Sequence, residues 1–440
     1  MKVSFISLGC AKNTVNAEQM MALCRDAGME LLNAPEGADV VVINTCGFID
    51  SAKSEAIDNI IAMGELKAEG RIGKILVTGC LSQRYKEEIL TELPEVDGVL
   101  GTGSYSEIVS AIEEVTGGGV PCRFGSIHAP VEELDRVLTT PPYIAYLRIA
   151  EGCDNHCAYC VIPSLRGKYR SRTMENVLSE AKKLADGGVK ELIIIAQDIT
   201  RYGIDLYGEK KLSALLHELC KMDFRWIRLH YLYPDEIDDE LIDTIAEEPK
   251  ILKYLDIPIQ HCNDDVLRAM NRRNTKEELL ELFYTLRGRI DGLVLRTSLI
   301  TGLPYEDEAA FDELCRFLRE VEIERAGVFP YSPEEGTRAA LMENRVDTAE
   351  AERRAELVVD VQSRIMDDFN ESRMGDVTEV LCEGWDAQSM SYAGRSWAES
   401  PDIDGRIYFT AQREVKDGEF VPVRITGTMD GELTGELWEE

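Results

Sequence analysis

The chain has 440 residues and a formal net charge of −33, with 81 Asp and Glu against 48 Lys and Arg. A chain of this length exceeds what one hydrophobic core holds, so two or three domains are expected. A field of this sign repels nucleic acid and attracts basic partners, which argues against a general RNA-binding protein. No apolar run reaches the ~20 residues of a membrane span and no secretory signal is recognisable, so the sequence predicts a cytoplasmic protein without a membrane partner.

Twelve cysteines are a high count for a chain expected in a reducing compartment, where disulfides rarely persist. Clustered cysteines in such a chain are better explained by metal binding or redox chemistry. Six of the twelve occur singly, and single cysteines usually pack as small buried hydrophobic side chains. These six are Cys24, Cys122, Cys220, Cys262, Cys315 and Cys382.

Residues 1–116 read as repeated strand–loop–helix units, and three of the strands end just before a cysteine. The three are Cys10, Cys46 and Cys80, spaced by 36 and 34 residues, about the length of one βαβ unit. Apolar strands that alternate with helices predict a parallel sheet with helices on its faces. Ligands bind beyond the carboxyl ends of such strands, so we expect the three cysteines to converge on one site.

The remaining chain predicts a linker and two further domains, which makes the protein a multidomain α/β protein. Residues 117–142 are rich in Gly and Pro, as linkers are. Residues 143–370 hold six apolar strand candidates separated by helical segments, which predicts a barrel-like or doubly wound α/β domain. Residues 373–440 hold short strands joined by Gly and Asp turns, a pattern typical of a small antiparallel β-barrel. The segment 376–440 is acidic, with 15 Asp and Glu against 5 Lys and Arg.

Three more cysteines, Cys153, Cys157 and Cys160, form a C-x3-C-x2-C pattern directly after the first strand of the central domain. Three thiolates on one loop suit a 4Fe–4S cluster whose fourth iron stays open to a small molecule. A closed zinc site prefers four ligands, and the fourth would have to be His156 inside the same tight loop. Tyr159 either offers a flat face to a planar group such as adenine or simply packs.

This loop, with an aromatic residue before its third cysteine, resembles the radical S-adenosylmethionine (SAM) superfamily. There the open iron binds SAM, and one electron from the cluster splits SAM to give a radical that abstracts hydrogen from an unactivated carbon. The stretches "SLGCAKN", "VINTCGF" and "VTGC", taken with this loop and the terminal barrel, resemble the methylthiotransferase family over essentially the whole chain. The resemblance implies a methylthiotransferase N-terminal domain (1–116), a partial (β/α)6 radical SAM core (143–370) and a TRAM domain (373–440).

The resemblance also implies two 4Fe–4S clusters and two SAM molecules in each reaction. The SAM-cleaving cluster would be held by Cys153, Cys157 and Cys160, and an auxiliary cluster by the three cysteines of the N-terminal domain. One SAM would donate a methyl group to a sulfur on the auxiliary cluster, and the other would supply the radical. A low-potential electron donor is implied as a partner, and no catalytic side chain is assigned.

The family has one branch that modifies adenosine in tRNA and another that modifies an aspartate of small-subunit ribosomal protein twelve. The stretches "YLDIPIQH" (254–261) and "YSPEEGT" (331–337) resemble the second branch. Acid at Glu334 and Glu335 suits a basic ribosomal protein and would repel phosphate, as would the acidic barrel. Two alternatives stay open: a tRNA methylthiotransferase, and a non-catalytic iron–sulfur carrier, which would normally have four cysteines per cluster.

Four cations follow the loop, and the sequence leaves their role open. An extended segment would place them on one face to bind phosphate; they could equally orient an acidic group or form salt bridges. They are Arg166, Lys168, Arg170 and Arg172. Departures from the family pattern are Ala11, Tyr305 and Arg338, where Pro, Gly and Pro are expected. Near Tyr305, Glu306 is either a SAM contact or an acid at a helix N-terminus.

Overall fold

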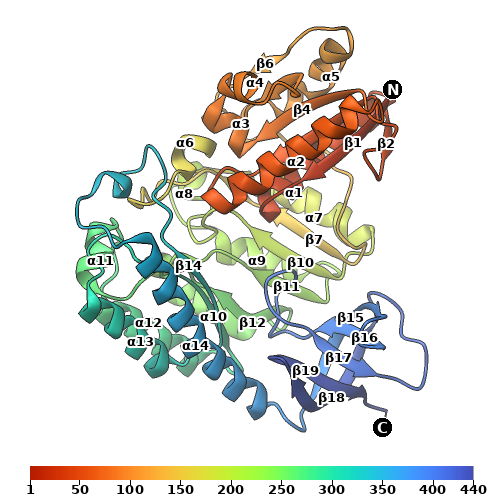
Figure 1. The fold of residues 1–440 in the computed structure, drawn as a ribbon. Helices are drawn as coiled ribbons and strands as arrows, with labels where there is room; N and C mark the ends of the chain where they lie inside the picture. The colour runs from red at the N-terminus through yellow and green to blue at the C-terminus, as the bar shows by residue number, and fades with distance from the viewer. Residues whose placement is uncertain (440) are drawn as a thin grey trace.

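The computed structural model describes residues 1–439, and Figure 1 shows an N-terminal domain, a central domain and a C-terminal barrel. The N-terminal domain is a six-stranded parallel sheet in the order β2-β1-β3-β4-β5-β6, as predicted. Its strands are β1 (Lys2–Ser7), β2 (Glu30–Leu32), β3 (Val40–Thr45), β4 (Lys74–Gly79), β5 (Gly98–Leu100) and β6 (Cys122–Arg123). Its helices are α1 (Ala11–Asp26), α2 (Asp50–Ala68), α3 (Cys80–Tyr85), α4 (Glu88–Glu92), η1 (Tyr105–Glu107) and α5 (Ile108–Thr116).

The segment 117–142 is only partly a linker, which corrects the sequence-based expectation. Cys122 pairs in parallel with Val99, so the sheet gains its last strand beyond residue 116. Further along, the backbone N–H of Thr139 donates to Glu18 of α1 at 2.7 Å, and Arg136 pairs with the same carboxylate at 3.1 Å. The Gly and Pro residues therefore interrupt helix and strand without freeing the segment from the domain.

The central domain is a six-stranded, all-parallel sheet in the order β14-β13-β12-β11-β10-β7, which confirms the predicted open (β/α)6 arrangement. Its strands are β7 (Ile144–Arg148), β10 (Glu191–Ile195), β11 (Trp226–Leu229), β12 (Ile251–Asp256), β13 (Val294–Thr301) and β14 (Arg325–Pro330). The strands β8 (Ala150–Glu151) and β9 (Arg170–Ser171) form a separate antiparallel pair. Its helices are α6 (Ile162–Arg166), α7 (Met174–Asp186), α8 (Ile204–Tyr207), α9 (Leu212–Cys220), η2 (Pro234–Glu236), α10 (Asp239–Glu247), α11 (Asp264–Ala269), α12 (Lys276–Arg289), α13 (Glu308–Val321) and η3 (Ala339–Leu341).

A long helix, α14 (Thr348–Ser372), crosses the central domain and leads to the terminal barrel (Figure 1). Asp347 caps it by accepting a hydrogen bond from the N–H of Ala349, and Gly375 takes a left-handed φ of 88° shortly after its end. Both residues act as the sequence predicts, because a short acidic side chain satisfies a free N–H and glycine tolerates positive φ.

The C-terminal barrel is closed, in the order β15-β16-β17-β19-β18. Its strands are β15 (Val377–Asp386), β16 (Ser391–Arg395), β17 (Ile407–Thr410), β18 (Phe420–Met429) and β19 (Glu432–Leu437). The expected antiparallel barrel needs one correction: β17 and β19 pair in parallel, and this pair closes the barrel. Closure removes the unpaired edges that a small open sheet would expose.

Buried ion pairs attach the barrel to the central sheet. Glu191 at the start of β10 is fully buried and accepts from Arg228 at 2.8 Å and from Arg395 of the barrel at 2.7 Å. The segment 396–404 reaches the same sheet, where Ser400 Oγ lies 2.9 Å from His230 Nε2. The Glu191 carboxylate therefore links β10, β11 and the barrel, which are far apart in sequence.

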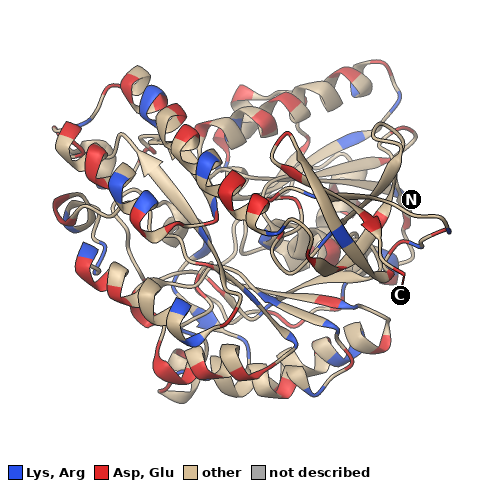
Figure 2. Ribbon diagram, turned by 90° about the horizontal axis from the view of Figure 1, so that it is seen from below, with Lys and Arg blue, Asp and Glu red and all other residues tan. Residues whose placement is uncertain are grey.

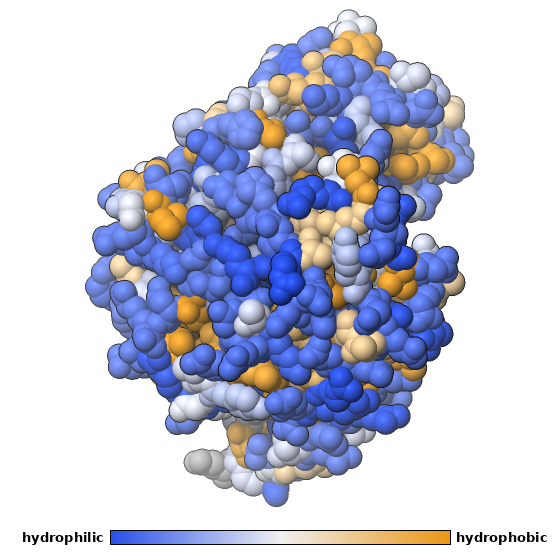
Figure 3. Space-filling model, turned by 90° about the vertical axis from the view of Figure 1, so that its left-hand side faces the viewer, coloured by the Kyte–Doolittle hydropathy of each residue, from blue (hydrophilic) through white to orange (hydrophobic). Residues whose placement is uncertain are grey.

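Acidic residues are frequent along the helices and in the barrel, with fewer basic residues between them (Figure 2). Figure 3 shows a face that is mostly hydrophilic, with apolar side chains in small scattered groups. Within residues 1–439, no helix is long and apolar enough to cross a membrane.

Candidate active site

The three cysteines of the N-terminal domain lie at the carboxyl ends of three adjacent strands, β1, β3 and β4, as the spacing predicts. Cys10 precedes α1, Cys46 directly follows β3, and Cys80 opens α3. Their loops approach closely: a Cβ on Gly9, whose φ is +88°, would stand 2.7 Å from Cys46 Cβ. Asn13 fastens the loops together, since its Nδ2 donates to the Leu8 carbonyl at 2.8 Å and to the Thr45 carbonyl at 3.0 Å.

The second triad lies on the loop between β8 and α6. The N–H of Cys153 donates to the Gly167 carbonyl at 3.2 Å, and that of Cys160 to the Cys157 carbonyl at 3.1 Å. The loop is anchored to the central domain where the N–H of Ala158 donates to the Met270 carbonyl at 2.9 Å. Its three thiols thus lie in a compact loop beyond the first strand of the central sheet, as predicted.

Each sulfur of the loop triad has a neighbouring hydrogen-bond donor. The backbone N–H groups of Asn155 and Ile162 point at Cys153 and Cys160 sulfur, each at 3.5 Å. Donors to thiolate sulfur are the groups with which proteins stabilise and tune iron–sulfur clusters, so the loop fits such a cluster.

Cys157 receives two side-chain donors in place of a backbone one. Tyr233 Oη lies 3.7 Å from its sulfur, and Arg272 Nη1 lies 3.9 Å from it. Tyr233 follows β11 closely, and Arg272 packs over its ring at 4.2 Å from the centroid. Sequence reasoning missed both residues, because neither belongs to a spaced motif.

A short helix joins the two triads. α6 begins two residues after Cys160 and ends at Arg166, and its five residues span about 7.5 Å. Cys80 packs against Val161 and Leu165 at this helix, together with Phe48. Cys80 of the N-terminal domain therefore lies beside the helix that directly follows the second triad.

Arg166, at the end of that helix, is a buried charge between the domains. Its guanidinium donates to Asn13 Oδ1 at 2.5 Å, to Asn16 Oδ1 at 3.1 Å and to Glu151 at 3.1 Å. Burial alone would raise the pKa of Glu151, but Arg166 and Arg148 outweigh it and lower that pKa to about 2. Arg166 thus ties the helix after Cys10 to the loop before Cys153.

The cations after the loop do not form a phosphate-binding face. Arg172 is buried and pairs with Glu133 and with Glu180, the latter at 2.6 Å. Arg170 donates to backbone carbonyls, including that of Lys168 at 2.9 Å. Only Lys168 of the four is exposed. Among the interpretations left open by the sequence, the structure supports salt bridges within the chain.

The thiol pKa values reflect burial and local charge. Burial raises the pKa of Cys46 and of Cys153 to about 11 each, and it also raises those of Cys80 and Cys160. Burial would raise the pKa of Cys10 too, but the cations Lys12 and Arg166 reverse the shift, and that pKa is lowered. Within the N-terminal triad, nearby positive charge therefore favours thiolate at Cys10.

Glu334 corrects the view that acid at 334 and 335 faces a basic partner. Glu334 is 3% exposed and accepts hydrogen bonds from Lys53 at 2.9 Å and Arg84 at 2.6 Å, both in the N-terminal domain. Arg84 also donates to the carbonyl of Gly47, which follows Cys46, at 3.0 Å. Glu334 therefore holds two domains together, and only Glu335 is exposed.

Replacing Glu334 with Gln is expected to loosen this contact, because it leaves Arg84 without its charged partner at a buried site. The expected loss is about 1.5–3 kcal/mol of stability. Hydrogen exchange would speed up in the peptides around residues 47–53 and 332–336. The matched control is Glu335→Gln at the exposed neighbour. Equal hydrogen exchange in both variants would contradict the role of Glu334 in holding the two domains together.

Two further residues that the sequence suggested as possible SAM contacts pack or pair within the protein itself. Tyr159 is half-buried beside an apolar cluster that contains Val266, Leu303 and Tyr331, so one side of its ring packs. Glu306 is buried, and its carboxylate accepts from the N–H of Gly302 and from Arg354, each at 2.9 Å. It is a structural acid rather than an available SAM contact.

The departures from the family pattern are tolerated locally. Ala11 occupies the first position of α1, where Pro and Ala both fit. Tyr305 takes a φ of 71°, a left-handed conformation that glycine adopts without strain. Arg338 precedes the short helix η3. Of the single cysteines, Cys122 is exposed and Cys220 is half-buried, contrary to expectation, and the other four are buried.

The spacing of the triads bears on which metal they hold. Within residues 1–439, no three His, Cys, Asp or Glu side chains gather closely enough to hold a single metal ion. His156 is exposed, with a left-handed φ of 51°, so it does not complete a zinc site from within the loop. A closed zinc site uses four ligands, whereas a four-iron cluster can be held by three thiolates with one iron left open, so these triads fit a cluster better than zinc.

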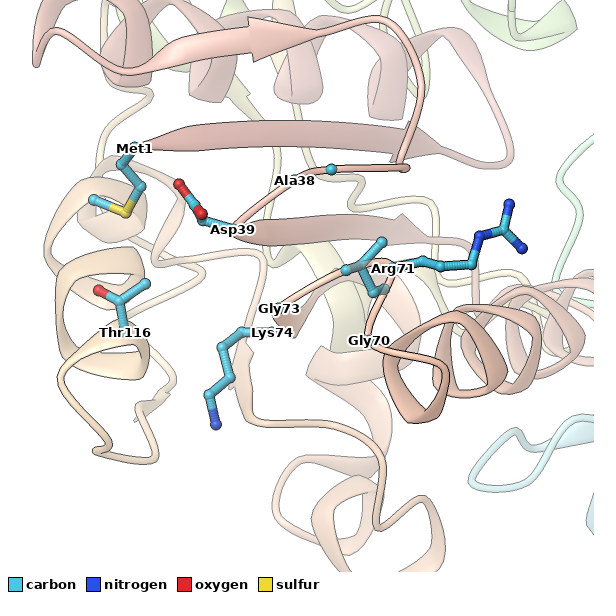
Figure 4. Close-up of a pocket in the computed structure, with 10 residues that line it drawn as sticks. Met1, Ala38, Asp39, Gly70, Arg71, Gly73, Lys74 and Thr116 are labelled. Carbon is cyan, nitrogen blue, oxygen red and sulfur yellow. The ribbon is translucent and has the colours of Figure 1, made fainter.

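A separate cavity of about 550 Å³ lies at the other end of the N-terminal sheet. Figure 4 shows Asp39, Arg71 and Lys74 among its lining residues, near the amino ends of β3 and β4. Lys74 already pairs with Asp97 at 2.9 Å. Parallel sheets bind ligands at their carboxyl ends, so this cavity is not part of the site.

Comparison with known proteins gives the family. The Uncharacterized protein family UPF0004 matches residues 2–101, the Radical SAM superfamily residues 147–318 and the TRAM domain residues 374–437. The TsrM radical SAM methyltransferase structure from Kitasatospora setae shares the fold, with a TM-score of 0.57 and 13% identity, over 77% of this chain and 76% of that chain.

Two relatives are similar over their whole length. A protein named ribosomal protein uS12 methylthiotransferase RimO, from Lachnoclostridium phytofermentans, is 48% identical over 99% of each chain. Another of the same name, from Caldanaerobacter subterraneus, is 47% identical over 99% of each chain. A radical SAM domain implies SAM and a 4Fe–4S cluster as cofactors. The chain therefore belongs to the RimO family of ribosomal protein uS12 methylthiotransferases, within the radical SAM superfamily.

Proposed function

We propose that this protein transfers a methylthio group to the β-carbon of an aspartate side chain in ribosomal protein uS12. The observation that carries the proposal is that two cysteine triads, from two domains, both adjoin helix α6, which follows Cys160 and packs against Cys80. A reaction that removes hydrogen from a carbon and then places sulfur on it needs two such sites within reach of one substrate atom.

We further propose that the triads hold two 4Fe–4S clusters, one on Cys153, Cys157 and Cys160 and one on Cys10, Cys46 and Cys80. When bound, reduced cluster and SAM together supply the radical chemistry and the methyl group. Three thiolates per cluster leave one iron free for an outside ligand, which an electron carrier with four cysteines lacks. A low-potential donor must supply the electron.

The chain's own residues orient and shield these groups. Arg272 donates to Cys157 sulfur, which the Tyr233 hydroxyl also contacts, and Arg166 places a buried charge beside Cys80. Packing of Phe48, Val161 and Leu165 around Cys80 shields this thiol from water. Exclusion of water protects a reactive carbon centre until sulfur is delivered.

The choice of a protein substrate is supported by charge. A net charge of −33 opposes tRNA, and the buried cations after the cysteine loop are engaged by carboxylates and carbonyls of the chain itself. Ribosomal proteins are basic, so an acidic enzyme surface attracts them.

A competition experiment tests the substrate. The reconstituted enzyme is given SAM, a low-potential reductant, and uS12 together with tRNA, and mass spectrometry locates the methylthio group. We expect it on an aspartate of uS12, with rate falling as salt is raised because acidic and basic surfaces attract each other. A product on tRNA would overturn the assignment, and an unchanged cluster spectrum on adding SAM would support an electron carrier.

A further inference from the structure

We propose that Lys12 binds the carboxylate of the substrate aspartate and so positions its β-carbon beside the N-terminal triad. Lys12 lies two residues after Cys10, in the first turn of α1, and is 7% exposed. Its Nζ lies 3.3 Å from the centroid of the Tyr231 ring, at the carboxyl end of β11. The inference rests on the proposed function, since it names how that substrate is held.

The ammonium group of Lys12 has no acidic partner of its own. No carboxylate of the described chain lies within ion-pair distance of its Nζ, which instead lies over the Tyr231 ring. Among residues 1–439, the other buried cations near the triads do have one: Arg148 and Arg166 pair with Glu151, and Arg172 with Glu180. Cys10 nearby can carry negative charge as a thiolate, and the carboxylate of a bound substrate would add a full counter-charge to the buried ammonium.

The position of Lys12 suits a substrate that must meet both triads. Tyr231 and Tyr233 leave the same strand end: the first contacts Lys12 and the second reaches Cys157. Tyr231 has a left-handed φ of 67°, which shows that the surrounding structure holds it in a strained conformation. The end of β11 therefore spans the space between the two sets of thiols.

The other cations at the site already donate hydrogen bonds to groups of the chain itself. Arg166 donates to Asn13, Asn16 and Glu151. Arg272 uses Nη1 on Cys157 sulfur and Nη2 on the Pro258 carbonyl, at 2.7 Å. Among these cations, Lys12 is therefore the one without a carboxylate or carbonyl partner in the described part of the chain. It lies beside the N-terminal triad, where sulfur would be delivered.

The chemistry of aspartate explains why a charge anchor is effective. Its carboxyl carbon is bonded directly to the β-carbon, so fixing the carboxylate restricts the positions that the reacting C–H bond can take. The C-terminal barrel borders this position, because its Ser400 contacts His230, the residue before Tyr231.

The test measures binding without turnover. Enzyme with reconstituted clusters and SAM, but no reductant, is titrated with a labelled uS12 peptide that carries the target Asp or Asn in its place. Wild-type enzyme is expected to bind the Asp peptide about 10- to 100-fold more tightly, the range of a hydrogen bond to a charged group. Lys12→Met should abolish this preference, and Lys12→Arg should retain most of it.

Iron content and absorption spectrum of each variant separate substrate binding from cluster assembly, and the exposed Lys168→Met is the matched control. Equal binding of both peptides by wild-type enzyme would overturn the role of Lys12, and that comparison needs no variant. A Lys12→Met enzyme that keeps the preference would do the same. Failure of wild-type enzyme to modify uS12 at all would overturn the proposed function instead.

Discussion

Replacing Cys10, Cys46 and Cys80 together with alanine should abolish methylthio transfer while SAM cleavage continues. The loop triad remains in this variant, so reduced enzyme should still form 5′-deoxyadenosine from SAM. Bound iron and sulfide should fall by about half, because one of two equal clusters is lost. Iron analysis, chromatography of the SAM products and mass spectrometry of uS12 measure the three quantities.

The reciprocal variant, with Cys153, Cys157 and Cys160 replaced by alanine, should lose both SAM cleavage and transfer and also keep about half of the iron. Cys122→Ala is the control, since that thiol is exposed on β6, away from both triads. Full iron content in the first variant would refute the N-terminal cluster. Loss of SAM cleavage in it would mean that the triads do not act separately.

Replacing Glu191 with Gln should destabilise the protein by about 3–5 kcal/mol, the cost of breaking a buried ion pair by removing one partner. Glu191 is fully buried between Arg228 and Arg395, and both arginines are less than 2% exposed. The variant leaves the Arg228 guanidinium without a carboxylate, and Arg395 with Glu383 alone, where the terminal barrel meets the central sheet. Urea unfolding measures the change, with the exposed Glu175→Gln as control.

The same carboxylate predicts a dependence of stability on pH. Burial would raise the pKa of Glu191, but Arg395 and Arg228 outweigh it, and the pKa falls from 4.5 to about 2. A lowered pKa stabilises the fold above the unfolded value, and this contribution is lost as pH falls from 4.5 toward 2. The difference in unfolding free energy between wild type and Glu191→Gln should therefore shrink over that interval. A constant difference would show that the pair does not titrate as described.

The sequence by itself determined the elements and the positions of the thiols. Periodic apolar runs predicted all six strands of the central sheet, because each buried strand is a continuous hydrophobic segment. Cys10, Cys46 and Cys80 were placed at strand ends by their spacing, since consecutive βαβ units bring those ends to one edge. The excess of acidic over basic residues and the C-x3-C-x2-C spacing can likewise be recognised without the tertiary structure.

Only the tertiary structure decided which charges are available. The sequence treats Glu334 and Glu335 as alike, yet one is buried against Arg84 of another domain and the other is exposed. In the sequence, Lys12 and Arg166 are both simply cations near cysteines. In the structure, Arg166 pairs with Glu151, whereas Lys12 has no carboxylate partner within residues 1–439. Burial and pairing depend on contacts between residues more than a hundred positions apart, and local patterns do not carry that information.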